Sequence, residues 1–440
     1  MSGTDAGPSL AERLVAAHFP ASDDELVVGA LPARELAARH GTPLYVFDAA
    51  VLRARLADVQ KALGDRVEVL FALKANPNAA VARVLREGGA GAEVASAGEI
   101  LVARRAGFAG RSMQFAGPGK HGDDLRLALA DGVTLNVESA AELDAVARAA
   151  AEAGVVCPVA LRVNPPAATA GSRMRMGGGS AKFGIDVDAL VEVARQAEAA
   201  ASIELRGLHT YAGTQTFDHE GWLAHARFLL DSARAVEGAI GRELPTLNFG
   251  GGFGVPVFES DGDFDLGAAG GGLQALVADD ARPDRRYFVE LGRYLVAPAG
   301  VFLARVIYLK ESAGKTHAIL DGGMHHHAAA AGLGTVIRRP FPMVKATALR
   351  AAAGEGCQLG GPLCTPADAF PTGASLPPLE PGDLVAFLSS GAYGLTFSNV
   401  LFLSHAAPAE VLVDGREAHV VRAAGRPDDA LRGQRLPGEA

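Results

Sequence analysis

The sequence predicts an α/β fold in which a (β/α)8 TIM-like barrel is joined to a C-terminal β-domain. Between about residues 44 and 297, short apolar segments alternate with helical segments rich in Ala, Leu, Arg and Glu. After residue 297 the helical segments become rare, and short apolar segments are separated by Gly and Pro turns instead. The length of 440 residues allows two such domains, each with its own core.

The first part of the chain is expected to contain eight strands, at residues 67–73, 92–94, 113–116, 134–137, 159–163, 205–210, 246–249 and 287–290. Helices are expected between most of them, at segments such as 79–87, 96–106, 140–153, 187–200 and 222–240. Eight strands in β/α alternation are typical of a closed parallel barrel, which places its chemistry at the C-terminal ends of the strands.

The second part of the chain is expected to form a β-sandwich or barrel-like domain over residues 298–425. Its strands are expected at residues 301–309, 316–321, 358–361 and 383–387. The N-terminal segment 1–43 contains short strand-like pieces and is expected to pack on this domain, which leaves residues 44–297 for the barrel. Residues 426–440 are expected to form a frayed tail.

The composition limits the classes of function. A hydrophobic content of 49% with 21% charged residues indicates packed cores. The net charge of −9 argues against a general nucleic-acid or anionic-membrane surface. The three cysteines, Cys157, Cys357 and Cys364, match neither a disulfide framework nor a zinc site, which indicates a reducing cytoplasm. The N-terminal residues lack the pattern of a signal peptide, and no apolar stretch has the length of a membrane span.

Lys74 follows the first expected barrel strand, in an apolar run that breaks at Asn76 and Pro77. An ammonium group at the end of a buried strand is costly unless the site uses it. A lysine amine in a poorly hydrated pocket becomes nucleophilic and forms a Schiff base with a carbonyl compound. The alternative is a lysine that only marks the strand exit and extends to water.

Gly250, Gly251 and Gly252 directly follow the seventh expected strand. Glycines let backbone amides close around an anion such as phosphate, and barrels often bind phosphate after their seventh strand. A dinucleotide-binding motif would instead need Gly-x-Gly-x-x-Gly in a first strand–helix turn, with an acidic residue about 20 residues later. The alternative interpretation is a purely structural turn.

Three further side chains are candidates for chemistry. His209, in the sixth strand, could face a flat ligand ring, although a lone strand histidine is more often a satisfied core residue. Glu290 ends the last strand, where a buried carboxylate needs a cationic or hydrogen-bonding partner, and an ion pair with Arg293 is the structural alternative. Cys364 lies among turn residues and is either an inert residue or a proton donor.

Together, these side chains predict pyridoxal 5'-phosphate (PLP) as the cofactor. A lysine would bind its aldehyde, glycines would hold its phosphate, an imidazole would stack on its ring, and a carboxylate would pair with its ring nitrogen. This is the set of groups that a PLP enzyme needs, because the cofactor works as an electron sink.

The chain resembles the fold-type III, alanine-racemase-like PLP-dependent decarboxylases, which include diaminopimelate, ornithine and arginine decarboxylases. The run Phe71–Asn76 is similar to the Schiff-base lysine motif of this family, and Glu93–Glu99 is similar to the segment that follows it. The resemblance extends from about Leu44 to Leu403. It implies a PLP-binding barrel with a β-domain, as the strand pattern predicts.

The resemblance also implies a role for individual residues. The cofactor-binding residues that it implies are Lys74, His209, Gly250, Gly251, Gly252, Glu290, Gly292, Arg293 and Tyr393. Among them Lys74 carries the cofactor, His209 stacks on the pyridine ring, and Glu290 pairs with the ring nitrogen.

The family also forms homodimers in which two subunits share the active sites. The resemblance therefore implies that Cys364 is delivered across a dimer interface as a second catalytic residue beside Lys74. It further implies that Arg293, Asp368 and Tyr393 contact the substrate.

The substrate class is indicated by the run Cys364–Asp368, which reads Cys-Thr-Pro-Ala-Asp. Diaminopimelate decarboxylases usually have Cys-Glu-Ser-x-Asp here, and the glutamate recognises the distal amino group. Its absence argues against a free diamino acid, because an uncompensated buried charge is costly. Segments 174–186, 321–327 and 336–340 are similar to decarboxylases of glutamyl or methylaspartyl groups held on acyl-carrier proteins.

The predicted function is that of a PLP-dependent carboxy-lyase acting on an acidic amino acid tethered to an acyl-carrier protein in natural-product biosynthesis. Arg338 and Arg339 are candidates for docking the acidic carrier, although two solvated loop arginines are an equal interpretation. The alternatives are a decarboxylase of free diaminopimelate, lysine or ornithine, an amino-acid racemase, and a non-catalytic PLP-binding regulator. No metal site is expected at His325–His327, because adjacent strand residues point to opposite faces.

Overall fold

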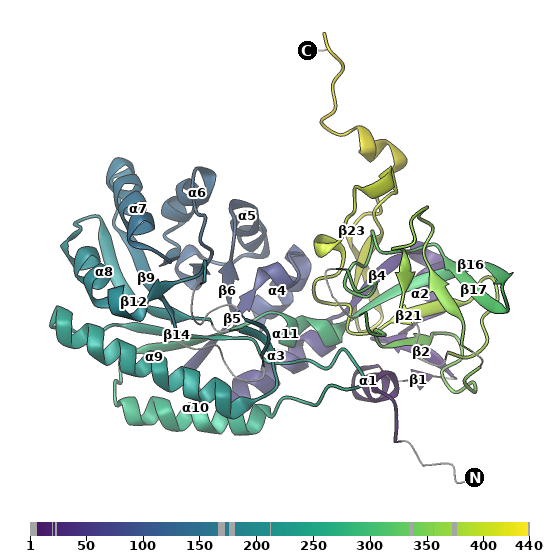
Figure 1. Ribbon diagram of the computed structural model, residues 1–440, viewed down its shortest axis with the longest axis horizontal. Coiled ribbons are helices and arrows are strands. Elements are labelled where there is room, and N and C mark those ends of the chain that lie inside the picture. The colour runs from purple at the N-terminus through teal and green to yellow at the C-terminus, as the bar shows by residue number, and fades with distance from the viewer. Residues whose placement is uncertain are drawn as a thin grey trace. The chain divides into compact units, whose positions relative to one another are not determined.

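The computed structural model of the chain describes residues 7–19, 21–22, 24–165, 172–175, 181–211, 213–333, 338–354, 356–371 and 376–438. The chain forms two compact units (Figure 1). The barrel unit comprises Leu52–Val255 and Gly262–Leu295. The β-unit comprises Met1–Val51, Pro256–Asp261 and Val296–Ala440.

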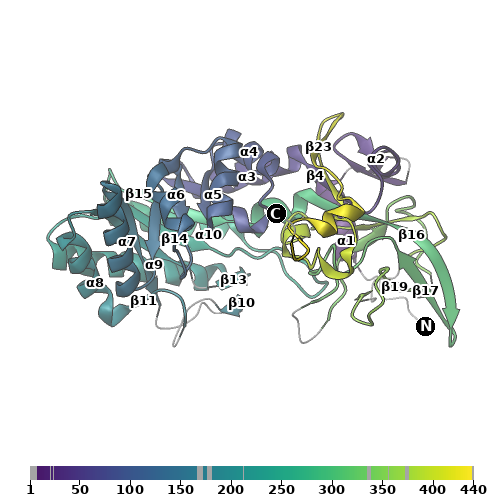
Figure 2. The same ribbon diagram turned by 90° about the horizontal axis from the view of Figure 1, so that it is seen from above.

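The barrel unit is built on eight parallel strands that close into a ring, with helices outside the ring (Figure 1 and Figure 2). In order around the ring the strands are β5 (Val67–Ala72), β6 (Gly91–Val94), β7 (Met113–Phe115), β8 (Thr134–Val137), β9 (Cys157–Asn164), β12 (Ile203–Thr210), β14 (Thr246–Gly251) and β15 (Arg286–Leu291). The pairing of β8 with β9 closes the ring. Because every pair is parallel, the C-terminal ends of these strands meet at one rim.

The helices of this unit are α3 (Ala49–Leu63), α4 (Ala79–Glu87), α5 (Ala97–Ala106), α6 (Asp123–Asp131), α7 (Ala140–Ala153), α8 (Val187–Ala199), α9 (His219–Ile240) and α10 (Leu266–Asp280). Except for α3, which precedes β5, they follow strands of the ring. At the start of α5 the Ser96 side chain accepts a hydrogen bond from the Glu99 backbone, and the left-handed Gly107 ends the helix. Helix α7 begins and ends in the same way, at Ser139 and Gly154.

Three short strands add to this unit. Strand β11 (Ile185–Asp186) adds to the edge of β9. Strands β10 (Ser172–Arg175) and β13 (Gly213–Thr216) form an antiparallel pair. Segment 174–186, which carries part of the predicted resemblance to carrier-dependent enzymes, lies in part outside the described residues.

The β-unit contains a large sheet with the strand order β20-β19-β17-β16-β4-β22-β23. Its elements are α1 (Leu10–His18), β1 (Ala21–Ser22), β2 (Glu25–Val28), β3 (Leu31–Pro32), α2 (Ala33–His40), β4 (Leu44–Asp48), β16 (Gly300–Ser312), β17 (Lys315–Leu320), β18 (Met343–Lys345), β19 (Gln358–Gly360), β20 (Ala369–Phe370), β21 (Leu384–Phe387), β22 (Ala409–Asp414) and β23 (Glu417–Arg422). Strand β16 pairs with β4 and β21 through its buried first residues and with β17 through its exposed end. The hydrophobic core of the β-unit includes Leu26, Val46, Val301, Leu303 and Val411.

The boundary between the units differs from the one that the sequence predicts. Strand β4 is apolar and precedes a helix, so residues 44–48 resemble a barrel strand in sequence. In the structure β4 pairs with β16 and β22, and the barrel unit begins at Leu52. Segment Pro256–Asp261 also belongs to the β-unit, where Glu259 accepts hydrogen bonds from the Leu10 backbone at 2.9 and 3.0 Å.

The predicted fold class is confirmed. Each expected barrel strand is present, with bounds within two residues of the prediction. Among the elements that the structure adds to the predicted ones are α3, α6, α10, β22 and β23, and the expected tail contains a short 3-10 helix, η6 (Pro427–Leu431). Within the described ranges, no helix combines the length and the apolar character that crossing a membrane requires.

Candidate active site

Most of the predicted cofactor-binding residues lie together at the C-terminal rim of the barrel. Lys74 lies in the 3-10 turn η1 (Leu73–Ala75) that directly follows β5. His209 and Glu290 lie near the ends of β12 and β15, and the glycines of residues 250–252 end β14. These strands are parallel neighbours in the ring, so the fold brings the four segments to one place.

The amine of Lys74 is paired with a buried carboxylate whose role was not predicted from the sequence. Its Nζ lies 2.5 Å from Oε2 of Glu93, and 5.8 Å from the centre of the Tyr211 ring. The Lys74 side chain is 38% exposed whereas that of Glu93 is 1% exposed, so the amine is accessible while its partner is not. Burial raises the pKa of Glu93 to about 7, against the opposing charge of Lys74 and with a smaller contribution from Glu290.

The raised pKa of Glu93 predicts a measurable pH dependence of folding. The folded state holds the proton up to about pH 7 and an unfolded chain only to about 4.5. The contribution of this proton to the free energy of unfolding is therefore complete below about pH 4.5 and is lost as the pH rises through about 7. In Glu93→Gln the melting temperature of the cofactor-free protein should fall less steeply between pH 5 and 8 than in the wild type. Parallel curves for the two proteins would contradict this assignment.

Glu290 is a buried carboxylate in contact with His209 and Asn248. Its Oε1 accepts a hydrogen bond from Nδ2 of Asn248 at 2.7 Å, and Nε2 of His209 lies 3.2 Å from the same oxygen. Burial acts to raise the pKa of Glu290, but the attraction of His209, the charge of Lys74 and the Asn248 hydrogen bond outweigh burial and hold this pKa below its ordinary value. The carboxylate is therefore ionised although it is buried.

The rim thus contains two buried carboxylates with different protonation. Glu290 stays ionised, and its charge helps to raise the pKa of Glu93. Pairs of acids whose pKa values are shifted in opposite directions by their surroundings are typical of sites that hold and move protons. His209 is fully buried beside them, and among the described residues its Nδ1 has no hydrogen-bond partner.

The glycine loop, residues 250–252, lies where the ends of three strands approach one another so closely that side chains do not fit. A Cβ atom on Gly250 would lie 2.3 Å from the Thr210 carbonyl oxygen, and one on Gly251 would lie 1.8 Å from the Glu290 carbonyl oxygen. Gly250 and Gly252 also have positive φ angles of 66° and 89°. The backbone N–H of Gly250 is donated to Oδ1 of Asn248 at 2.9 Å, so Gly250 serves the loop through its conformation.

Gly292 joins the end of β15 to α11 (Arg293–Val296). A Cβ atom on Gly292 would lie 2.8 Å from Cβ of Ala75, which is the residue after Lys74. The glycine therefore lets the turn after β15 pack directly against the turn that carries Lys74. This contact places the start of α11, with Arg293, at the same rim.

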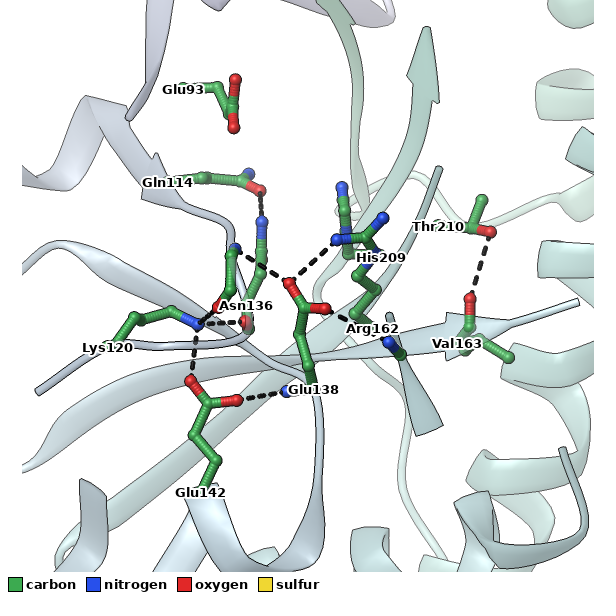
Figure 3. Close-up of polar contacts among 12 residues, drawn as sticks. Glu93, Gln114, Lys120, Asn136, Glu138, Glu142, Arg162, Val163, His209 and Thr210 are labelled. Carbon is green, nitrogen blue, oxygen red and sulfur yellow. Dashed lines mark hydrogen bonds and ion pairs between the residues drawn. The ribbon is translucent and has the colours of Figure 1, made fainter. Parts of the chain in front are cut away.

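A buried charge network at the ends of β7, β8 and β9 was not predicted from the sequence (Figure 3). Nη1 of Arg162 donates to Oε1 of Glu138 at 2.8 Å, with side chains 6% and 2% exposed. Nζ of Lys120 donates to Oε1 of Glu142 at 2.6 Å, with side chains 1% and 9% exposed. The backbone N–H of Glu138 donates to Oε2 of Glu142 at 2.7 Å and links the two pairs.

This network fixes backbone at the rim. Glu138 also accepts hydrogen bonds from the backbone N–H of Gly117 at 2.8 Å and of Gly184 at 3.2 Å, and Lys120 donates to the Gly117 carbonyl. Two cations and two carboxylates are fully paired, which is how buried charges are tolerated. A sequence signal did exist, because Arg162 interrupts the apolar strand β9.

The remaining predicted residues belong to the β-unit. Cys364 is a free, exposed cysteine, and Tyr393 is half-buried with a left-handed φ of 52°. Asp368 is buried, and its two oxygens accept hydrogen bonds from the backbone N–H of Met324 at 2.7 Å and of Leu363 at 2.8 Å. Asp368 therefore holds the loop that carries Cys364, and its contact with substrate stays a prediction.

Arg338 and Arg339 are both exposed. Nη1 of Arg338 lies 3.4 Å from the carbonyl oxygen of Ala367, which places this arginine beside the loop that carries Cys364. Nη1 of Arg339 lies 3.3 Å from Oγ of Ser260. Residues 336 and 337 of the segment 336–340 lie outside the described residues.

The three consecutive histidines do not form a strand. The backbone N–H groups of His326 and His327 both donate to the Gly323 carbonyl, which makes a turn at residues 323–327. His325, His326 and His327 are buried, and burial lowers their pKa values to about 3, 4 and 3. Among the described residues, no cluster of His, Cys, Asp or Glu side chains is arranged to hold a metal ion.

A cavity of about 420 Å³ lies at the opposite, N-terminal end of the barrel strands. Its lining includes the ion pair of Glu68 with Arg286 at 2.6 Å and that of Glu204 with Arg206 at 2.8 Å. In barrels the chemistry lies at the other rim, and this end contributes to stability. The rim of Lys74, and not this cavity, is therefore the candidate active site.

The chain has clear relatives among known proteins. Residues 49–297, more than half of the chain, match the family model described as "Pyridoxal-dependent decarboxylase, pyridoxal binding domain". The chain is 36% identical over 410 residues to the L-glutamyl-[BtrI acyl-carrier protein] decarboxylase of Niallia circulans, which covers 91% of this chain and 95% of that protein. It is 32% identical over 432 residues to the diaminopimelate decarboxylase of Methanothermobacter thermautotrophicus, covering 94% and 96%.

The fold also matches a solved structure. The crystal structure of diaminopimelate decarboxylase from M. jannaschii in complex with L-lysine matches with a TM-score of 0.87 at 25% identity, covering 96% of this chain and 98% of that chain. The relatives and the fold match more than nine-tenths of the chain, and the family model matches residues 49–297. The chain therefore belongs to the pyridoxal-dependent decarboxylases, and it is a PLP-dependent amino-acid carboxy-lyase.

Proposed function

We propose that this enzyme removes the α-carboxylate of an acidic amino acid held as a thioester on an acyl-carrier protein, as a step of natural-product biosynthesis. The relative from Niallia circulans, whose name states a glutamyl group on a carrier protein, supports this substrate class. The observation that carries the proposal is the run Cys364–Asp368. Its single carboxylate, on Asp368, is buried and occupied by two backbone donors, so this run offers no free carboxylate to a distal ammonium.

A second candidate is the decarboxylation of a free diamino acid. The diaminopimelate decarboxylase of Methanothermobacter thermautotrophicus and the M. jannaschii structure with L-lysine support it. In this case a carboxylate from another part of the chain would have to compensate the distal ammonium of the substrate.

The residues of the rim fit PLP. Lys74 presents an accessible amine for the aldehyde, and the ionised carboxylate of Glu290 suits a protonated ring nitrogen. His209 is the candidate for the ring face, and its Nδ1 has no hydrogen-bond partner within the part of the chain that the structure describes. Gly250–Gly252 are the candidates for the phosphate loop. When bound, PLP supplies an electron sink for the charge that develops when carbon dioxide leaves.

The protein groups around this site have separate tasks. The amine of Lys74 must be free of its extra proton to act as a nucleophile, and Glu93, 2.5 Å away with a pKa near 7, can take up and return a proton there. Glu290 keeps a fixed negative charge in surroundings that exclude water. It stabilises positive charge on a nitrogen that faces it, and such pre-arranged electrostatic stabilisation is usually the largest contribution to the rate.

Cys364 is our candidate for the proton donor to the substrate carbon. It is an exposed thiol on a loop that Asp368 fixes by hydrogen bonds. We propose that it acts across the interface of a homodimer, as the family resemblance implies. A monomer in analytical ultracentrifugation at assay concentrations would contradict the shared site.

We also place the enzyme in a reducing cytoplasm, which its free cysteines support.

Carrier docking predicts an effect of charge reversal at Arg338 and Arg339. The double substitution Arg338→Glu with Arg339→Glu should raise KM for the carrier-bound substrate about tenfold, because complementary charges steer association. PLP affinity should not change. The matched control is Arg432→Glu with Arg435→Glu, two exposed arginines near the C-terminus, which should behave as the wild type. An unchanged KM in the first variant would contradict this docking surface.

The substrate class is tested with a panel of free amino acids and aminoacyl-carrier proteins. The holoenzyme should release carbon dioxide, with the matching loss of mass, from an acidic amino acid on the carrier and not from the same amino acid free in solution. Turnover of free diaminopimelate, lysine or ornithine would establish the second candidate instead. Loss of optical activity without gas release would identify a racemase.

A further inference from the structure

Asn248 connects the two parts of the rim that are candidates for opposite ends of the cofactor. Its side chain is 2% exposed and lies in β14. Oδ1 accepts a hydrogen bond from the backbone N–H of Gly250 at 2.9 Å. Nδ2 donates to Oε1 of Glu290 at 2.7 Å and to Oε1 of Gln114 at 2.8 Å. Both amide hydrogens and the carbonyl oxygen of the side chain are thus in use.

The orientation of this amide follows from its partners. An ionised Glu290 can only accept hydrogen bonds, and the backbone N–H of Gly250 can only donate one. The Asn248 nitrogen must therefore face Glu290 and its oxygen must face Gly250. Gln114 then has to present its own oxygen to the second N–H of Asn248.

The backbone explains why a side chain is needed here. The register of β14 against β15 shifts between Asn248 and Gly251, where three steps along β14 match two along β15. Such a bulge takes backbone groups out of the ladder of the sheet. The Asn248 side chain accepts a hydrogen bond from the backbone N–H of Gly250, two residues later, as in an Asx-turn.

We propose that Asn248 is a positioning residue that ties the carboxylate of Glu290 to the glycine loop, and so sets the spacing between the groups that hold the ring nitrogen and the phosphate of PLP. This inference rests on the proposed roles of Glu290 and of Gly250–Gly252. Besides Asn248, the groups that act on Glu290 are His209 from β12, Lys74 after β5 and Glu93 from β6. Among the described residues, only Asn248 is hydrogen-bonded to both the Glu290 carboxylate and the glycine loop.

The substitution Asn248→Asp separates this role from that of a simple turn residue. Aspartate keeps an oxygen for the Gly250 N–H, so the turn is preserved. It loses both donors and places a carboxylate against Glu290 and the Gln114 oxygen. A residue that served only the turn would tolerate this change, whereas a residue that positions an ionised Glu290 would not.

The readout is cofactor affinity of the purified apoprotein, measured with PLP and with a carbon analogue of PLP that lacks the ring nitrogen. Asn248→Asp should weaken PLP binding at least about tenfold, because a hydrogen bond to a charged group is lost. It should weaken binding of the analogue by less than about threefold, since the analogue has no nitrogen for Glu290. Asn248→Ala, which also releases the loop, should weaken both.

Unchanged PLP affinity in Asn248→Asp, or equal losses for both ligands, would overturn the positioning role. A wild-type protein that binds the analogue as tightly as PLP would instead contradict the proposed role of Glu290. Circular dichroism of the variants controls for folding. Should Asn248→Asp not fold, Asn248→Ser, which keeps an acceptor for Gly250 but reaches less far toward Glu290, carries the same comparison with the two ligands.

Discussion

Replacing Lys74 with arginine should reduce kcat at least about a thousandfold while the protein remains folded. The guanidinium stays protonated and cannot act as the nucleophile that binds the cofactor aldehyde. Loss of a residue that acts directly on the reacting group typically costs several orders of magnitude. The measurement is carbon dioxide release from the best substrate of the wild-type enzyme, at saturating PLP.

Arginine is chosen because it keeps the positive charge beside Glu93. The pair of Lys74 and Glu93 is 2.5 Å apart, and removal of the cation would leave a buried carboxyl without its partner. The melting temperature of Lys74→Arg should therefore stay close to that of the wild type, whereas that of Lys74→Ala should change. Turnover of Lys74→Arg within tenfold of the wild type would show that another residue carries the chemistry.

Glu138→Gln should lower the free energy of unfolding by about 3–5 kcal/mol, which is the typical cost of leaving one partner of a buried ion pair alone. Arg162 would remain 6% exposed without its counter-charge, and the backbone N–H groups of Gly117 and Gly184 would face a weaker acceptor. The measurement is urea-induced unfolding of the cofactor-free protein, followed by circular dichroism.

Glu204→Gln is the matched control for this prediction. Glu204 pairs with Nη1 of Arg206 at 2.8 Å, the same distance as in the pair of Glu138 and Arg162, but its side chain is 51% exposed. Exposed pairs contribute about 0–1 kcal/mol, so the control should shift stability little. Equal losses in the two variants would contradict the structural importance of the buried network.

The barrel was predictable because its strands are buried on both faces. Strand β5 has one exposed residue, Glu68, and otherwise forms an apolar run bounded by turn residues. Strand β4 shares this property although it lies outside the barrel unit. This strand is also fully buried, and only its hydrogen-bonded partners, β16 and β22, show that it belongs to the β-unit.

The candidate site was predictable where a residue type is unusual for its place. Lys74 and Glu290 stand out because they end apolar strands, and the family resemblance supplied their expected roles. The partners Glu93, Asn248 and Glu138 were not assigned roles, because each contacts a residue that lies at least 19 positions away, on or directly after another strand. A pattern along one strand contains no information about such contacts.

The three histidines show a further limit of sequence patterns. The expected strand is replaced by a turn, since Gly322 and Gly323 precede them and the Gly323 carbonyl accepts two backbone hydrogen bonds. A Cβ atom on Gly323 would lie 2.4 Å from Oδ1 of Asp368, so close packing around that carboxylate requires glycine here. The partner that imposes this turn lies 45 residues farther along the chain, where local sequence could not indicate it.

The most direct test of this active site is to locate the lysine that holds the cofactor. The holoenzyme is reduced with borohydride, digested, and analysed by mass spectrometry for a peptide that carries pyridoxyl phosphate. We expect the added mass on Lys74 and its absence in Lys74→Arg. A modified peptide from another lysine, or none in a wild-type protein saturated with PLP, would contradict the assignment of the active site to this rim.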